Sequence, residues 1–250
     1  MNNSDFYSEL ISSFKEIAKK NNLLDEVFVL KSTALSTEEA IGNPDRKDFP
    51  LMKGKEKLLQ TDFKDSKGQA YTDMPGNWSC TLKEIIDNPI ETNFDRAMLI
   101  AALNAVCANL GLCCSTIHCK NNDPEDCAKE YLDYLKQNYN DVSKIGLIGL
   151  QPSILQMLTE NYKTRIVDLN PDAIGTHKFG ILIEDSEKMI DDMINWADLI
   201  LCTGSTVVNG SLVEILNMVN GAGKEILFFG TSIAGTAAIM NLKRFCPKAI

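Results

Sequence analysis

Glycine, hydroxyl and amide side chains gather in one nine-residue segment with the composition of a ligand-binding turn. Residues 203–211 read Thr-Gly-Ser-Thr-Val-Val-Asn-Gly-Ser and directly follow a short apolar run. Backbone N–H groups at the start of a helix, together with neutral hydroxyl donors, suit an anion or a polar ligand. The alternative, capping of the next helix by Asn209 or Ser211, needs only one of these residues. The predicted contacts here are Thr203, Gly204, Ser205, Thr206 and Asn209.

Two further turns extend this candidate site. Residues 230–235, Gly-Thr-Ser-Ile-Ala-Gly, resemble the first turn in composition and add Gly230, Thr231 and Ser232 to the predicted contacts. Gly149 follows another apolar run, and Asp168 lies 168 − 149 = 19 residues later. That spacing is close to the one at which an acidic side chain binds a ribose hydroxyl. Asp168 is equally suited to cap the Asn-Pro turn that follows it, and both interpretations stay open.

A cysteine-rich loop offers a different chemistry. Cys113, Cys114, His118 and Cys119 carry the thiolate and imidazole donors that zinc and softer metals prefer. Their spacing matches no zinc-finger pattern, and a buried β-segment over residues 112–117 is an equally good interpretation. The loop is therefore a candidate site for a heavy or transition metal ion.

One amide lies where an apolar residue is expected. Asn104 interrupts the apolar run over residues 100–106, and a buried amide must find hydrogen-bond partners. We predict that it joins two parts of the molecule or contacts the ligand. The sequence contains no recognisable Ser-His-Asp, H-E-x-x-H or Walker A pattern, so it leaves open whether the protein is an enzyme.

The elements that would hold these residues differ between the two halves of the chain. In the second half, short apolar strands alternate with helices, which predicts a mainly parallel sheet covered by helices. The expected strands are residues 144–150, 165–169, 179–183, 198–202 and 225–229. The expected helices are residues 154–160, 188–196, 212–219 and 234–242.

The first half predicts an α+β arrangement. Helices are expected over residues 6–17 and 94–110, with Asn93 as the cap of the latter, and a short helix follows a capping Thr81. A short strand is expected over residues 26–30, and the many glycines and prolines of residues 36–78 predict loops and short strands there. A new helix starts with Asp123 as its expected cap. We therefore place the domains at residues 1–122 and 123–250.

Composition excludes several classes of protein. The formal charge is −9, from 34 acidic and 25 basic side chains, and no basic patch stands out, so nucleic acid is not an expected partner. No run of eighteen apolar residues suits a membrane span, and the N-terminus lacks the pattern of a signal peptide. We expect a cytoplasmic protein without membrane contact whose eight cysteines are reduced.

The motifs, taken in order, resemble the putative heavy-metal chelation family, a domain of unknown function. The resemblance rests on residues 101–105 (Ala-Ala-Leu-Asn-Ala), Gly149 with Pro152, residues 168–171, residues 203–211, residues 230–232 and residues 242–245. It implies an enolase N-terminal-like α+β domain followed by a Rossmann-like domain. It also implies a site between the two domains that includes Asn104, Asp168, Thr203, Ser205, Thr206, Asn209 and Ser232. The cysteine-rich loop is outside the family pattern.

Three functional hypotheses follow. The first is a protein that binds a small polar or metal-bearing ligand in the cleft between the domains, in heavy-metal chelation or related anaerobic cofactor metabolism. The second is an enzyme that uses a nucleotide or S-adenosylmethionine, suggested by Gly149 and Asp168. The third is a metal carrier that uses the thiolates of the cysteine-rich loop. The identity of the cofactor stays open, and a homo-oligomer is compatible with each hypothesis.

Overall fold

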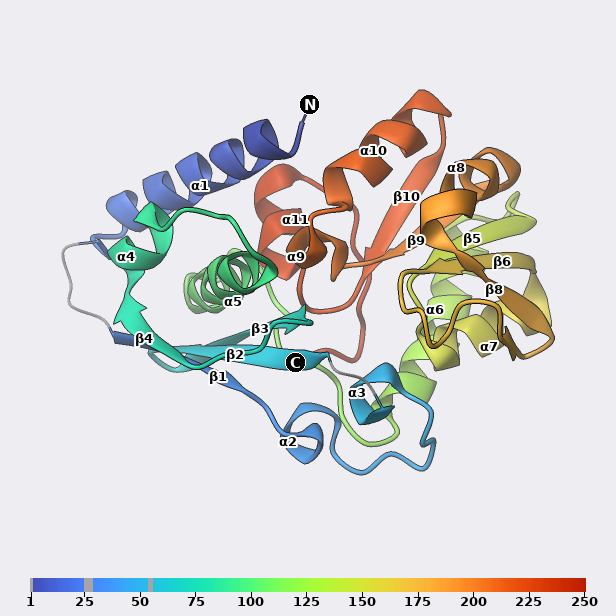
Figure 1. Ribbon diagram of the computed structural model, residues 1–250, viewed down its shortest axis with the longest axis horizontal. Helices are drawn as coiled ribbons and strands as arrows, with labels where there is room; N and C mark the ends of the chain where they lie inside the picture. Colours follow the sequence, from blue (N-terminus) through green and yellow to red (C-terminus); the bar gives the residue numbers. More distant parts are fainter. Residues whose placement is uncertain (1, 25–28, 54–55) are drawn as a thin grey trace.

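The described residues of the protein form two β-sheets and eleven helices. The computed structural model describes residues 2–24, 29–53 and 56–250, in which a four-stranded sheet precedes a six-stranded sheet along the chain (Figure 1). The predicted α/β class is confirmed, with a mainly parallel second sheet. None of the helices in the described part of the chain is long and apolar enough to cross a membrane.

The first sheet is antiparallel, with strand order β3-β2-β1-β4. Its strands are β1 (Val29–Ala34), β2 (Lys57–Phe63), β3 (Ser66–Thr72) and β4 (Trp78–Thr81). The strand expected over residues 26–30 is observed only in part, because β1 begins at Val29 and residues 25–28 lie outside the described residues. The glycine- and proline-rich segment 36–78 contains two strands of seven residues, β2 and β3, because its glycines and prolines lie mostly in the connections.

The five described helices of the first half are α1 (Asn3–Lys20), α2 (Thr37–Ile41), α3 (Pro50–Lys53), α4 (Leu82–Asp87) and α5 (Asn93–Asn109). Four of these five helices begin with a capping box, and α5 makes the most extensive contact with this sheet. Thr81 caps α4 as predicted. The predicted cap Asn93 is wrong by one residue, because the Thr92 hydroxyl accepts from the Asp95 N–H while the Asp95 carboxylate accepts from the Thr92 N–H.

The second sheet has the order β10-β9-β5-β6-β8-β7. Its strands are β5 (Lys144–Ile148), β6 (Lys163–Asp168), β7 (His177–Lys178), β8 (Ile181–Asp185), β9 (Leu199–Thr203) and β10 (Glu225–Phe229). All five predicted strands are present, and every pair is parallel except β7 with β8. Two-residue β7 was not predicted because it is too short to show a pattern.

Helices cover both faces of this sheet, as predicted from its apolar strands. They are α6 (Asp123–Asn138), α7 (Pro152–Asn161), α8 (Ser186–Trp196), α9 (Thr206–Asn209), α10 (Leu212–Gly221) and α11 (Ala234–Met240). Ile145 and Leu147 of β5 pack with α6 and α7, whereas Ile148 points to the opposite core. The predicted cap Asp123 is also wrong by one residue, since Asn122 precedes the first turn of α6 and makes no side-chain capping bond.

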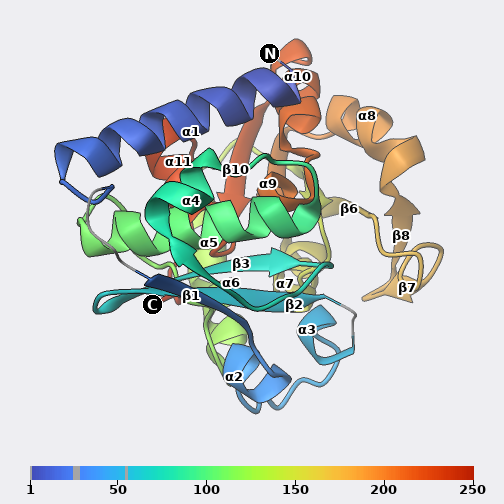
Figure 2. The ribbon, with the colours of Figure 1, turned by 60° about the vertical axis from the view of Figure 1, so that its left-hand side comes forward.

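The two sheets share one hydrophobic core. Helix α5 is almost entirely buried and packs on β3 on one side and on α9 and α11 on the other. Figure 2 shows α1 and α5 stacked over the four-stranded sheet, beside the second half of the chain. Apolar residues of α1, α5, α8, α10 and β10 form a single buried cluster. This continuous packing fixes the first sheet relative to the carboxyl ends of the second sheet.

Candidate functional site

A cavity of about 550 Å³ lies where the carboxyl ends of β5, β6, β9 and β10 face β3 and α3. In the observed strand order, β5 is flanked by β6 on one side and by β9 on the other. The chain therefore leaves β5 and β9 in opposite directions along the sheet, and a crevice forms at such a switch point. Parallel α/β sheets bind their ligands in this crevice.

Most of the predicted contact residues line this one cavity. Nine of the eleven are in its wall, contributed by four separate turns: Gly149, Asp168, Thr203, Ser205, Thr206, Asn209, Gly230, Thr231 and Ser232. The two exceptions are Asn104 and Gly204, which lie behind the wall. The tertiary structure thus assembles turns that are up to 83 residues apart in sequence (232 − 149 = 83).

The turn after β5 requires glycine. Gly149 has φ +89°, and a Cβ at this position would lie 2.5 Å from Cγ2 of Thr203 at the end of β9. A larger residue would therefore strain the backbone and push the two turns apart. Gly149 allows the turns on either side of the switch point to approach closely.

Asp168 connects the first turn to the second. One carboxylate oxygen accepts from the Leu150 N–H at 2.6 Å, and the other accepts from the Asn170 N–H at 2.7 Å. The capping role of Asp168 is therefore confirmed. Each oxygen retains another lone pair, so the same carboxylate can also accept from a ligand hydroxyl in the cavity that it lines. Ribose recognition by Asp168 stays a prediction.

The hydroxyl-rich turn after β9 is held by its own side chains. The Thr206 hydroxyl donates to the Thr203 carbonyl at 2.8 Å, and the hydroxyls of Thr203 and Ser205 are 3.1 Å apart. The Asn209 side chain accepts from the N–H and the hydroxyl of Ser211 at 3.0 and 2.7 Å. Asn209 therefore forms the local turn that precedes α10, in addition to lining the cavity.

Gly204 does not line the cavity, so its predicted ligand contact is corrected to a structural role. Its N–H donates to the Phe229 carbonyl at 2.7 Å, and a Cβ would lie 2.8 Å from the Ile233 side chain. The turns after β9 and β10 meet at this position. A residue with a side chain would separate them, so glycine is required for packing rather than for ligand contact.

Asn104 is also behind the wall and acts as the predicted connection between parts of the molecule. Its fully buried amide group donates toward the carbonyls of Gln69, Thr231 and Ser232 at 2.9, 3.1 and 3.1 Å. Its oxygen accepts from the Gly235 N–H at 2.7 Å. Helix α5 thereby ties β3 to the turn after β10.

The first half of the chain contributes polar residues to the cavity that the sequence did not single out, three of which carry titratable side chains. Glu56, Tyr71 and Asp73 line the wall opposite Asp168. Burial, together with the nearby carboxylates of Asp168 and Asp73, raises the pKa of Glu56, although a hydrogen bond with the Tyr71 hydroxyl opposes this shift. Burial and the neighbouring Glu56 also raise the pKa of Tyr71. These residues lie in a polar, glycine-rich segment without a motif, and only the folded sheet brings them to Asp168.

The charges in the wall restrict the ligand. Glu56, Asp73, Asp168 and Asp172 contribute four carboxylates, and no Lys or Arg is present among the lining residues that the structure describes. Carboxylates accept hydrogen bonds and attract cations, and they repel anions. The arrangement suits hydroxyl, amine or other cationic groups better than a polyphosphate.

The cysteine-rich loop does not assemble into a metal site. Cys113 packs beside Cys107, Cys114 is exposed, and the His118 ring nitrogen Nδ1 lies 2.6 Å from the Cys119 carbonyl oxygen. Burial lowers the pKa of His118 and raises that of Cys119. Across residues 2–24, 29–53 and 56–250, no three His, Cys, Asp or Glu side chains are close enough to hold a metal ion.

The alternative interpretation of this loop, a buried β-segment over residues 112–117, is wrong. The segment forms no strand, and Leu112 is exposed. Only the end of the loop reaches the cavity, where His118 and Cys119 line the wall together with Cys127 and Cys246. The thiols at the cavity thus come largely from other elements than the predicted loop.

Comparison with known proteins supports the resemblance over part of the chain. Residues 133–240 match the model of the family described as "Putative heavy-metal chelation" (DUF364). The resemblance to this family is confirmed for these residues. No curated protein matches the chain.

Two similar crystal structures are proteins of unknown function from the same family. One, from Pyrococcus horikoshii, is 19% identical with a TM-score of 0.48, over 89% of this chain and 79% of the other. The second, from Desulfitobacterium hafniense, is 15% identical with a TM-score of 0.49, over 74% of this chain and 72% of the other.

Proposed function

We propose that this protein binds a small organic ligand, with or without a bound metal, in the cavity at the switch point of its parallel sheet. The observation that carries the proposal is the convergence of nine predicted contact residues from four turns on one cavity. Its volume of about 550 Å³ is within the usual range for small-molecule sites, roughly 300–1,000 Å³. The ligand would contact both halves of the chain, which we propose to be domains 1–122 and 123–250.

The chemistry of the wall supports a ligand rich in hydroxyl or amine groups. The hydroxyls of Thr203, Ser205, Thr206 and Thr231 offer neutral donors and acceptors, and the four carboxylates offer strong acceptors. Apolar side chains, including Phe49, complete the wall and would bury the rest of the ligand.

A nucleoside-containing cofactor is the second candidate, and the geometry of Gly149 and Asp168 favours it. Gly149 forms the first strand-to-helix turn, and Asp168 ends the next parallel strand, which is where a ribose is bound in dinucleotide-binding sheets. The negative wall favours S-adenosylmethionine, whose sulfonium is cationic, over a dinucleotide with two phosphates. Binding of this cofactor would make the protein a candidate enzyme.

The family description suggests a metal, and the described residues do not fit a resident metal ion. The donors of the cysteine-rich loop point into different surroundings, and no group of three ligands is present in the described chain. We therefore derive no step that depends on a bound metal. A metal would reach the cavity as part of a ligand that supplies its own coordinating atoms.

The proposal can be tested without knowing the ligand. The purified protein is incubated anaerobically with a metabolite extract, passed through a desalting column and analysed by native mass spectrometry and elemental analysis. We expect the wild type to retain a stoichiometric small molecule. The variant Ser205→Trp, which places an indole in the cavity, should lose it, whereas Ser8→Trp on the exposed face of α1 should not.

Two results would contradict the proposal. One is a wild-type protein that retains no small molecule from the extract. The other is equal retention by Ser205→Trp and the wild type, because the retained molecule would then bind elsewhere. Elemental analysis of the retained complex separates a metal-bearing ligand from a metal-free one.

A further inference from the structure

One wall of the cavity is a segment that belongs to neither main core. Residues 43–52, here called the strap, lie between α2 and β2 in the sequence and include the start of α3. Phe49, Pro50 and Leu51 of the strap line the cavity. Phe49 and Leu51 are buried in a cluster that has six buried members among the described residues and is separate from the two large clusters. The strap therefore has few apolar contacts to hold it in place.

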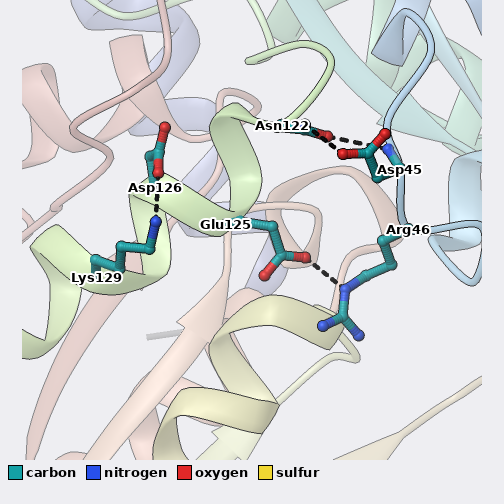
Figure 3. A pocket seen from close by; sticks show the side chains of 6 residues that line it. All are labelled: Asp45, Arg46, Asn122, Glu125, Asp126 and Lys129. Atoms are coloured by element: carbon teal, nitrogen blue, oxygen red, sulfur yellow. Dashed lines mark hydrogen bonds and ion pairs between the residues drawn. The ribbon is translucent and has the colours of Figure 1, made fainter.

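Charged side chains connect the strap to the second half of the chain. The Arg46 guanidinium donates to Glu125 on α6 and to Gln156 on α7, and it stacks over the Phe179 ring with 5.3 Å to the centroid. Figure 3 shows Arg46 extended from the strap toward Glu125 at the edge of α6. These contacts join the strap, three residues before Phe49 of the cavity wall, to two helices that are about 80–110 residues away in sequence.

Asp48 provides a second charged contact. It forms an ion pair with Lys178 on β7. Burial raises the pKa of Asp48, but the hydrogen bond and charge of Lys178, together with the charge of Arg46, outweigh burial, so the pKa is lowered. The other oxygen of Asp48, Oδ1, is buried, has no hydrogen-bond partner among the described residues and lies 3.7 Å from an Arg46 nitrogen. A buried acceptor without a partner is unfavourable, so this contact stabilises the observed position incompletely.

The start of the strap is held in a different way. The side-chain oxygens of Asn121 and Asn122 accept from the N–H groups of Asn43 and Asp45, both at 3.0 Å. Asn122 also donates to the Asp45 carboxylate at 2.7 Å. These neutral donors and backbone contacts are insensitive to salt, whereas the ion pairs of Arg46 and Asp48 are screened by it.

We propose that the strap is a gate of the cavity, which the contacts of Arg46 and Asp48 hold shut against α6, α7 and β7. Partly exposed ion pairs contribute little individually, so their release is far easier than unfolding of the protein. When they release, residues 46–52 move away from the cavity while residues 43–45 stay anchored. The gate concerns access to the cavity and needs no assumption about the ligand.

Cysteines inside the cavity can report its opening. Cys119 and Cys127 are buried and line the cavity, whereas Cys202 is buried in the main core outside its wall. The full-length protein is treated with N-ethylmaleimide under native conditions, and modification of each cysteine is followed by peptide mass spectrometry. We expect Arg46→Gln and Asp48→Asn each to raise the modification rate at Cys119 and Cys127 by about three- to tenfold.

Further measurements distinguish gating from other effects. Sodium chloride at high concentration should raise the same two rates in the wild type and have less effect in Arg46→Gln. Lys15→Gln, which removes an ion pair between α1 and Asp87, should leave the rates unchanged. The rate at Cys202 should be the same in all variants.

Three outcomes would overturn the proposal. The first is an unchanged rate at Cys119 and Cys127 in Arg46→Gln and Asp48→Asn. The second is an increase in Arg46→Gln alone, which would indicate loosening of α6 at Glu125. The third is an equal increase at Cys202, which would indicate global destabilisation. Since no ligand is used, failure of the gate leaves the ligand-binding proposal standing, and the converse also holds.

Discussion

Replacement of Asn104 by alanine should destabilise the protein more than any other single polar substitution in α5. Asn104 is fully buried, and its side chain makes contacts with three carbonyls and one N–H group in two other parts of the chain. An amide has only two N–H hydrogens, so the three carbonyls share two donors. Asn104→Ala therefore removes about three hydrogen bonds and leaves buried backbone groups without partners.

The expected cost follows from these contacts. With a net value of about 1 to 1.5 kcal/mol for each lost bond, the free energy of unfolding should fall by roughly 3 to 4.5 kcal/mol. For a chain of this length, that loss lowers Tm by about 6 to 18 °C. Asn109 on the same helix is the matched control, because its single side-chain bond, to the Ser66 hydroxyl, is 3.4 Å long. Asn109→Ala should cost less than about 1 kcal/mol.

Urea unfolding and hydrogen exchange measure the global and the local effect of Asn104→Ala. Urea unfolding gives the loss of free energy. Amide exchange at Gly235, whose N–H donates to Asn104, should accelerate in Asn104→Ala more than exchange in the core of α5. A loss below about 1 kcal/mol, or unchanged exchange at Gly235, would refute the assignment of Asn104 as the link between β3 and the turn after β10.

Three further predictions concern the turns and the core. Gly149→Ala should lower the free energy of unfolding by roughly 2 to 4 kcal/mol in urea, through its positive φ and the contact with Thr203, whereas Gly221→Ala, with open space around it, should not. Asp168→Asn places an amide NH₂ against a backbone N–H and should cost about 1 to 3 kcal/mol and abolish ligand retention; unchanged stability and retention would contradict this. Burial raises the pKa of Tyr7 to about 12, outweighing the nearby Arg96, so the unfolded chain releases this proton near pH 10 while the folded protein retains it. The contribution of protonated Tyr7 to the free energy of unfolding should therefore be fully present below pH 10. The free energy of unfolding should then fall by roughly 2 kcal/mol between about pH 10 and 12. Tyr7→Phe should flatten this pH dependence in urea titrations, and an identical slope in both proteins would argue against it.

Local sequence determined most of the second half of the fold. Strands β5, β9 and β10 carry near-continuous apolar runs, β6 and β8 carry shorter ones, and the helices between them carry helical spacing, so both signals are present in short windows. The turns after β9 and β10 could be predicted for the same reason, because their glycine and hydroxyl residues are adjacent in sequence. Capping positions were wrong by one residue at α5 and α6, because neighbouring Thr, Asn and Asp residues compete for the same role.

The composition of the cavity depended on contacts that no local pattern encodes. Glu56, Tyr71 and Asp73 belong to a segment without a motif and reach Asp168 only because the shared core places the first sheet over the carboxyl ends of the second. The cysteines show the same dependence on packing. The four donors of the loop form no group of three ligands in the described chain, whereas Cys119 of the loop meets Cys127 and Cys246 at the cavity.

The difference between what local sequence determines and what tertiary packing determines has a physical basis. Secondary structure and turn geometry depend on the alternation of apolar residues, on backbone freedom and on capping within a few residues, all of which can be read from the sequence. A binding cavity depends on the packing of surfaces against each other, and its net charge is the sum over residues from several elements. The sequence therefore determined the turns of the site, and the packing of the two sheets decided what faces them.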